Sequence, residues 1–402
     1  MGYTPCIAEP DVWMKQIDDS HYEYIAVYVD DLAIASKDCQ NIISIFIVKY
    51  QFKLKGTGPI KFHLGMDFFH DKDGTLCYAP KKYIQRLSDS YLQMFNSSPH
   101  ASYQSPLEHN DHPEIDDSDF LDPEGIQKFQ SMIGSLQWVT QIGRIDITAA
   151  TMTMSGFRQA PKNGHLERAK RMYGYLTKMK DAVIRIRTDE PDYSDLPKLV
   201  YDWERSVYGK GSEIMPHNQP KALGKRVIIT SYVDANLFHD ILTGRSVKGL
   251  LHLLNKTPID WYSKKQATVE TATYGSEYVA VRTCVEQIMD LRSTLRYMGV
   301  PVSGETFMFG DNKAVVDSSN IPHYKIHKRH NMLSYHRVRE AIAYKICTFF
   351  HIDGNINPAD ILSKHWSYAK VRDSIKPLLF YSGNTMDLVH DIKSNSLQKK
   401  GE

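Results

Sequence analysis

The sequence predicts a protein of mixed helical and β structure (α+β or α/β) with more than one domain, and three observations support this. Its 402 residues exceed what a single hydrophobic core usually serves. Runs of β-branched and aromatic residues, typical of strands, are followed by stretches whose apolar residues recur at helical spacing. Two polar, proline-interrupted stretches, 100–125 and 188–224, separate these patterns and indicate boundaries between domains.

The first hundred residues favour β structure. Residues 22–36 read as a hairpin of two short strands with Asp30 and Asp31 at its tip. Residues 39–51 have a helical pattern, and 60–79 predict two further strands joined by a turn.

The middle of the chain favours helices. Residues 100–125 carry eight acids and no Lys or Arg, so we expect a solvated loop rather than a calcium site. Residues 124–180 predict helices, interrupted by a break at 160–164. Residues 188–224 are rich in Pro, Gly and Asp and are interpreted as a linker or an insertion.

From residue 225 the pattern changes to a strand-rich and then alternating order, which predicts one further domain over 225–367. The tail after Lys393 is expected to be disordered. The expected elements are strands at 227–234, 247–254 and 258–263, a helix at 272–298, a strand at 306–310, helices at 312–318 and 331–344, a strand at 346–352, and a helix from Pro358.

The long helix predicted at 272–298 has one apolar face. We interpret this face as core, and Cys284 on it as a buried apolar residue rather than a nucleophile. The residues that recur at helical spacing are Ala280, Cys284, Ile288, Leu291 and Leu295.

Composition limits the function classes. The formal net charge of +2 excludes a strong basic field over the whole molecule, so any affinity for nucleic acid comes from local patches. The five cysteines contain no Cys-x-x-Cys pair, which argues against a zinc knuckle or a disulfide framework. No secretory signal is evident, and the longest apolar run, 42–48, is too short to cross a bilayer. We therefore expect cytoplasm, or nucleus, and no membrane partner.

Four acids carry the main functional signal: Asp234, Glu277, Asp311 and Asp360. Taken singly, each reads as a surface or capping acid, since Asp near a helix start is stabilised by free N–H groups. Taken together, they suggest a metal site, because crowded carboxylates repel one another until a cation enters. Two Mg²⁺ ions about 3.5–4 Å apart, held by carboxylate oxygens, are suited to phosphodiester cleavage.

Residues 230–365 resemble the ribonuclease H domain of copia-type LTR retrotransposons. The resemblance implies an RNase H-like mixed five-stranded sheet with flanking helices, with Asp234 on the central strand and Glu277 on the long helix. It also implies that the four acids bind two Mg²⁺ ions, for which Mn²⁺ can substitute, with no small-molecule cofactor. The matching blocks are Tyr232–Ala235, Asp260–Gln266, Ser276–Ala280, Gly310–Ala314, Lys328–Asn331 and Asn357–Lys364.

Upstream segments resemble the copia-type reverse transcriptase: a partial palm over 1–110 and a thumb- or connection-like helical region over 111–187. Asp30 and Asp31 then match the polymerase acids, but only 29 residues precede Asp30 and the further palm Asp is missing. We therefore expect a truncated palm without autonomous polymerase activity. The matching blocks are Tyr28–Asp31, Phe62–Met66, Lys82–Ile84, Tyr103–Pro106, Phe129–Trp138, Arg144–Ile147 and His165–Arg171.

Basic residues near the acids are candidates for binding nucleic-acid phosphates; the alternative is a solvated helical face. The basic stretch 162–187 carries the same two interpretations. Trp138, Tyr173 and Tyr175 are expected to pack rather than to stack on bases. The candidate phosphate ligands are Lys264, Lys265, Lys328, Arg329, His330 and Arg337.

The function implied is Mg²⁺-dependent hydrolysis of the RNA strand of an RNA–DNA hybrid, with recognition through 2′-hydroxyls and duplex shape. Two alternatives stay open. One is a degenerate, non-catalytic retrotransposon relic. The other is a nucleic-acid-binding subunit that completes a separate polymerase chain. Cleavage of a labelled RNA–DNA hybrid distinguishes the nuclease function from both alternatives.

Overall fold

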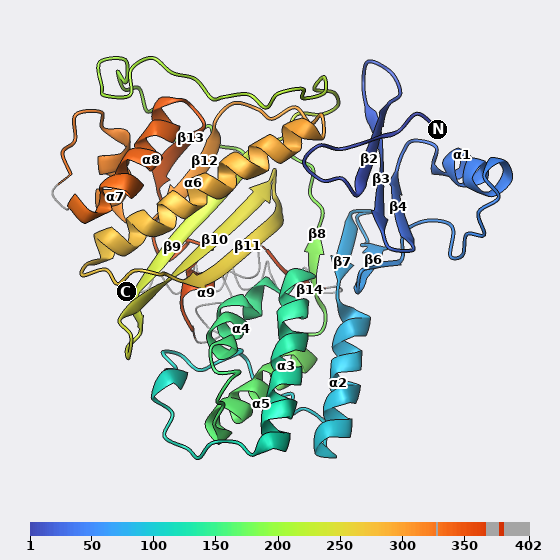
Figure 1. Ribbon diagram of the computed structural model, residues 1–402, viewed down its shortest axis with the longest axis vertical. Coiled ribbons are helices and arrows are strands. Elements are labelled where there is room, and N and C mark those ends of the chain that lie inside the picture. The colour runs from blue at the N-terminus through green and yellow to red at the C-terminus, as the bar shows by residue number, and fades with distance from the viewer. Residues whose placement is uncertain (327–328, 367–377, 382–402) are drawn as a thin grey trace, which may run out of the picture.

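The computed structural model describes residues 1–326, 329–366 and 378–381, and the strands in this part of the chain form three sheets (Figure 1). The prediction of mixed helical and β structure is confirmed. The tail after Lys393 and the candidate ligand Lys328 lie outside the described residues.

The first sheet is antiparallel, with strand order β1-β2-β3-β4. Its last two strands form the predicted hairpin: Tyr28 pairs with Asp31, and Val29 adopts a left-handed φ of 52° in the turn. The predicted helix at 39–51 begins as α1 (Cys39–Ser44) and continues as a π-helical turn, Ile45–Lys49. The strands are β1 (Thr4–Pro5), β2 (Val12–Gln16), β3 (Tyr22–Tyr28) and β4 (Asp31–Ala35).

The second sheet is also antiparallel, with order β14-β8-β7-β6-β5, and its strands come from distant parts of the chain. The chain leaves β7, forms four helices, and returns as β8 beside β7. The strands are β5 (Phe62–His63), β6 (Met66–His70), β7 (Leu76–Ala79), β8 (Ala182–Arg185) and β14 (Phe380–Tyr381).

The four helices between β7 and β8 pack around their own apolar core. Tyr173 and Tyr175 are buried in it, which confirms that they pack, whereas Trp138 is 40% exposed. The helices are α2 (Lys81–Phe95), α3 (Pro123–Gln141), α4 (Thr148–Ser155) and α5 (Asn163–Lys178), with 3₁₀ turns at Pro113–Ile115 and Ile145–Ile147.

The acid-rich stretch 100–125 is held against α5. The expectation of a solvated loop is therefore wrong for two of its acids, Asp111 and Asp116. Arg168 lies 2.8 Å from a carboxylate oxygen of Asp111 and 2.5 Å from one of Asp116, and both acids are largely buried. Arg171 pairs with the exposed Glu108 at 2.9 Å. These contacts also engage two cations of the basic stretch 162–187, which weakens its interpretation as a phosphate-binding surface.

The third sheet has order β11-β10-β9-β12-β13: its first three strands are antiparallel, and β12 runs parallel to both neighbours. This confirms the predicted mixed five-stranded sheet, with Asp234 on its central strand. The strand carrying Asp234 was expected to end there, but it continues for six more residues to Asp240. The strands are β9 (Ile229–Asp240), β10 (Arg245–Leu254), β11 (Thr257–Lys265), β12 (Thr306–Gly310) and β13 (Cys347–His351).

Helices cover both faces of this sheet. On one face α6 crosses the strands (Figure 1), and its predicted core positions are buried, except for the half-buried Leu291. On the other face α9 packs with residues of β8 and β10 in a smaller core. The helices are α6 (Thr273–Tyr297), α7 (Lys313–Asn320), α8 (Met332–Ala343) and α9 (Asp360–Ser363), with a 3₁₀ turn at Arg329–Asn331.

Residues 188–224 contain no helix or strand among those described, yet they are fixed to the third sheet and its helices. Glu213 forms ion pairs with Arg292 at 2.7 Å and with Arg296 at 2.6 Å, both on α6. The hydroxyl groups of Tyr193 and Thr230 lie 2.7 Å apart. In the described part of the chain, every helix is too short or too polar to cross a bilayer.

Candidate metal centre

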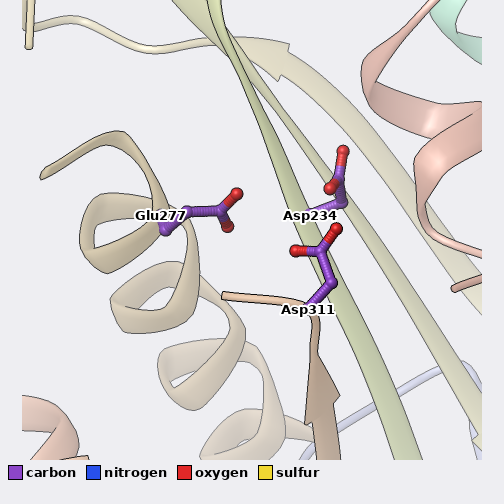
Figure 2. A group of neighbouring side chains, drawn as sticks. All are labelled: Asp234, Glu277 and Asp311. Atoms are coloured by element: carbon purple, nitrogen blue, oxygen red, sulfur yellow. The ribbon is translucent and has the colours of Figure 1, made fainter. Parts of the chain in front are cut away.

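Three of the four predicted acids converge beside the central strand of the third sheet, where the neighbouring strand β12 ends. Asp234, Glu277 and Asp311 each offer one carboxylate oxygen, and these oxygens lie within 4.8 Å of one another. Figure 2 shows Asp234 on its strand, Glu277 reaching across from the helix, and Asp311 at the end of the neighbouring strand. Three separate parts of the fold therefore supply one carboxylate each.

Local structure explains why these side chains meet. The parallel strands β9 and β12 pair up to Val233 and Gly310, which places Asp311 beside the residue that follows Val233. The turn after Asp311 is fixed because the Asn312 side chain accepts a hydrogen bond from the N–H of Val315 at 3.2 Å, capping α7. Glu277 lies near the start of α6, which packs against β9.

The environment of Asp234 fits a cation. Its side chain is 1% exposed, and Oδ2 accepts a hydrogen bond from the Ser363 hydroxyl. Oδ1 is buried without any hydrogen-bond partner among the described residues. A buried carboxylate oxygen without a partner costs about 1–3 kcal/mol or more, and a divalent ion held by this oxygen would remove that cost.

The pKa values of Glu277 and Asp311 are raised, as crowding of carboxylates predicts. Burial, then the charges of Asp234 and Asp311, raise the pKa of Glu277 well above its ordinary value. Burial, then the charge of Asp234, raise the pKa of Asp311 to about 6. Both carboxyl groups hold protons more tightly than free acids do, and metal binding would displace those protons.

Asp360 stands outside the group of three, next to a lysine that the sequence reasoning did not single out as a site residue. Lys364 forms an ion pair with Asp360, and its Nζ lies 3.4 Å from Oδ2 of Asp234. Burial acts to lower the pKa of Lys364, but the charges of Asp234 and Asp360 outweigh it and the pKa is raised. Its only signal in the sequence is its place in the matching block Asn357–Lys364.

The segment that carries Asp360 and Lys364 is held to the sheet by one buried side chain. Asn357 donates from Nδ2 to the carbonyl oxygen of Val233 at 3.0 Å, and its Oδ1 accepts from the N–H of Ala359 at 3.1 Å. Gly249, which pairs with Asp234 across the sheet, has no room for a side chain: a Cβ there would lie 2.7 Å from the carbonyl oxygen of Ala359. The glycine therefore permits the close approach of α9.

Hollows open beside the acids, although the Asp234 side chain itself is buried. Two hollows of about 400 and 430 Å³ open here, and both are lined by Asp311 and Lys364. The first extends over Asp353 and Asp360, and the second over Asp234 and Glu277. Open space therefore adjoins the site, and Asp311, which is only partly buried, borders both hollows.

Two of the candidate phosphate ligands lie on β11. Lys265 is committed to the fold, since its Nζ lies 2.5 Å from a carboxylate oxygen of the buried Asp240. Lys264 is exposed and lies directly opposite Lys248 in the β10–β11 pair. Like charges facing each other across a pair of strands are destabilising, so an anion at this position would be favourable.

Three further candidates lie in α8 or just before it, and two of them, His330 and Arg337, have acidic neighbours. His330 is exposed and lies 3.2 Å from Oε2 of the buried Glu270. Arg337 pairs with Glu340 at 2.9 Å, and both side chains are about 40% exposed. Arg329 belongs to the 3₁₀ turn before α8.

The hairpin acids are separate from this centre. Asp30 and Asp31 are both exposed at the tip of β3 and β4. Within the described part of the chain, no third acid, histidine or cysteine joins them in a group that could hold a metal ion.

Comparison with known proteins gives relatives for most of the chain, although no family model matches it. A retrovirus-related Pol polyprotein from a Nicotiana tabacum transposon (TNT 1-94) is 24% identical over 372 residues, which cover 90% of this chain and 25% of that protein. A putative transposon Ty5-1 protein of Saccharomyces cerevisiae is 25% identical, covering 72% of this chain and 80% of that protein. The Pol polyprotein from transposon RE1 of Arabidopsis thaliana is 22% identical and is covered over 22% of its length. The chain thus spans about a quarter of the polyproteins.

Solved structures with similar parts include two ribonucleases H. One is LC11-RNase H1 in complex with an RNA/DNA hybrid, at 18% identity and a TM-score of 0.28, covering 34% of this chain and 93% of that one. The other is the N-terminal RNase H domain of a Mycobacterium tuberculosis protein, at 12% identity and a TM-score of 0.27, covering 37% and 97%.

Proposed function

Because the chain is a homologue of the Pol polyproteins of copia-type LTR retrotransposons, we propose that residues 225–367 form a divalent-metal-dependent ribonuclease H. The substrate is an RNA–DNA hybrid, and the reaction is hydrolysis of the RNA strand. The observation that carries the proposal is the convergence of Asp234, Glu277 and Asp311, with one buried oxygen of Asp234 lacking a partner among the described residues.

The ion best suited to this donor set is Mg²⁺, with Mn²⁺ as a substitute, because all the donors are hard carboxylate oxygens. Asp234, Glu277 and Asp311 would hold one ion, and Asp360 is the fourth acid available for a second. The ions supply activation of water and stabilisation of the leaving oxygen. Ser363 and Asn357 keep the acids in place: one hydrogen-bonds Asp234, and the other ties the Asp360 segment to β9.

Substrate binding is assigned to two cations of the same domain that are at least partly exposed, Lys264 and Arg337. Lys264 has no acid directly opposite it. Arg337 pairs with Glu340 and contacts the sulfur of Met289, but its side chain stays partly exposed, so both cations can contact phosphates. Discrimination of RNA from DNA would rest on the 2′-hydroxyl groups and on the shape of the duplex rather than on base edges.

The chain is proposed to lack autonomous polymerase activity. Asp30 and Asp31 are not accompanied by a third ligand in the described residues, and phosphoryl transfer by two ions needs them held in place. Primer extension on an RNA template by the purified chain would contradict this proposal.

A cleavage assay tests the nuclease directly. The full chain is incubated with Mg²⁺ and an RNA–DNA hybrid labelled on its RNA strand, beside Asp311→Asn and duplexes of DNA alone and RNA alone. Cleavage of the hybrid by the wild type only supports the proposal. Equal cleavage by both proteins would reveal a contaminating nuclease, and no cleavage by a folded wild type would favour the non-catalytic reading.

A further inference from the structure

We propose that the ammonium group of Lys364 is a built-in cation that takes the place of one of the two divalent ions, between Asp234 and Asp360. In the absence of nucleic acid, the centre then binds a single divalent ion, at Asp234, Glu277 and Asp311. This inference rests on the proposed function, since it assigns the cation occupancy of the same site.

The contacts of Lys364 define this position. The ammonium group is ion-paired with Asp360, and its Nζ lies 3.4 Å from Oδ2 of Asp234. The ammonium group therefore links Asp360, which lies outside the group of three acids, to Asp234, which belongs to that group. The side chain is only 27% exposed, whereas the Asp234 and Asp360 side chains are 1% and 9% exposed. This is an interior ion pair, not a surface contact.

The same atoms show where a divalent ion is still needed. Lys364 and Ser363 both engage Oδ2 of Asp234, whereas Oδ1 has no partner in the described residues. The group of three that contains Asp234 also contains Glu277 and Asp311. The ammonium group of Lys364 thus offsets negative charge between Asp234 and Asp360. No cation of the described residues does the same at Oδ1 of Asp234, on the side of Glu277 and Asp311.

Formal charge gives the consequence. Four carboxylates and one ammonium group keep a net negative charge after one divalent ion binds, but a second ion would leave the cluster positive. That second ion would also lie beside the ammonium group and compete with it for Asp234 and Asp360. Its binding is therefore weak until Lys364 moves or a negative group arrives, and a phosphate of the substrate is such a group.

The site leaves room for this exchange. Lys364 lines both hollows, so its flexible side chain can turn from the acids toward either. The residue follows α9 in an extended conformation, with φ −134° and ψ 159°, and its N–H donates to the carbonyl oxygen of Asp360. Movement of the ammonium group therefore needs side-chain rotation only.

Calorimetric titration with Mn²⁺ tests the inference without depending on catalysis. The full chain is titrated in the absence of nucleic acid, beside Lys364→Met, which removes the charge, and Lys364→Arg, which keeps it. We expect one tightly bound ion in the wild type and in Lys364→Arg. In Lys364→Met we expect two, with the second at least tenfold tighter than any second ion in the wild type.

Two ions of similar affinity in the wild type would overturn the inference, whatever the variants do, and so would a single ion in a folded Lys364→Met. Circular dichroism establishes whether the variant is folded, and Lys364→Gln serves as a second uncharged variant if it is not. No Mn²⁺ binding by the folded wild type would instead refute the metal centre itself. One ion bound equally by all three proteins leaves the nuclease proposal standing and removes only the role of Lys364.

Discussion

Replacement of Asp311 by Asn should stabilise the metal-free protein while abolishing its response to Mg²⁺. Burial and the charge of Asp234 raise the pKa of Asp311 to about 6, from an ordinary value of 3.8. Each tenfold change in proton affinity is about 1.4 kcal/mol, so the ionised Asp311 destabilises the folded state by about 3 kcal/mol at pH 8. Partial exposure of the side chain makes this an upper bound.

The sign of the pH dependence follows from linkage. Because the folded pKa of this acid is raised, the folded state binds the proton more tightly, and the ionised group opposes folding above a pH of about 6. The advantage of Asp311→Asn should therefore be full at pH 8, shrink as the pH falls through 6, and vanish below about 3.8.

Urea unfolding in EDTA at pH 8 and at pH 4.5 measures this advantage, and the same experiment with Mg²⁺ supplies the contrast. Mg²⁺ should stabilise the wild type according to its occupancy and leave Asp311→Asn unchanged. If the variant in EDTA at pH 8 were less stable than the wild type, crowding of charge at this site would not be the dominant effect of Asp311.

The other predictions concern stability and binding elsewhere. Burial acts to raise the pKa of Glu213, but hydrogen bonds from Arg292 and Arg296 lower it to about 2 from 4.5. Its charge thus stabilises the fold by at most about 3 kcal/mol at pH 7, because solvent screens part of the interaction. Urea unfolding of Glu213→Gln should show a loss up to this size, and the difference should shrink as the pH falls below about 4.5. Lys264→Ala should weaken binding to a hybrid, measured by fluorescence anisotropy against salt, and reduce the salt slope by about one. Lys265→Ala, which leaves Asp240 without its cation, should lower the free energy of unfolding instead; equal effects of both variants on binding alone would contradict this division.

The order of elements could be predicted from the sequence because it rests on local patterns. The strand at 306–310 and the helix near 272–298 have a strong period and clear ends, and the structure places them within about one residue of the prediction. The strand carrying Asp234 was cut short because Asn236 and His239 interrupt its apolar run, although both are accommodated in β9. Pairing with β10, a tertiary effect, extends the strand beyond its local signal.

Contacts between distant charges could not be predicted, since ion pairs leave no periodic signal. Asp111 and Asp116 looked solvated because no cation lies near them in sequence, but Arg168, more than fifty residues away, binds both. Glu213 has the same relation to α6, 79 residues away. Of the candidate site, the convergence of Asp234, Glu277 and Asp311 came from residue order and family resemblance, whereas the engagement of Asp360 by Lys364 depends on side-chain placement.

The balance of charge explains why these acids need a cation at all. At an effective dielectric constant of about 20, two carboxylates 4.8 Å apart repel by about 3 kcal/mol, and the group of three contains three such pairs. Lys364 relieves only Asp234 and Asp360 strongly, which leaves Glu277 and Asp311 with raised pKa values. A site needed only for folding would gain stability by replacing these two acids with apolar residues. The divalent ion proposed for that side, beside the oxygen of Asp234 without a partner in the described residues, would offset this repulsion.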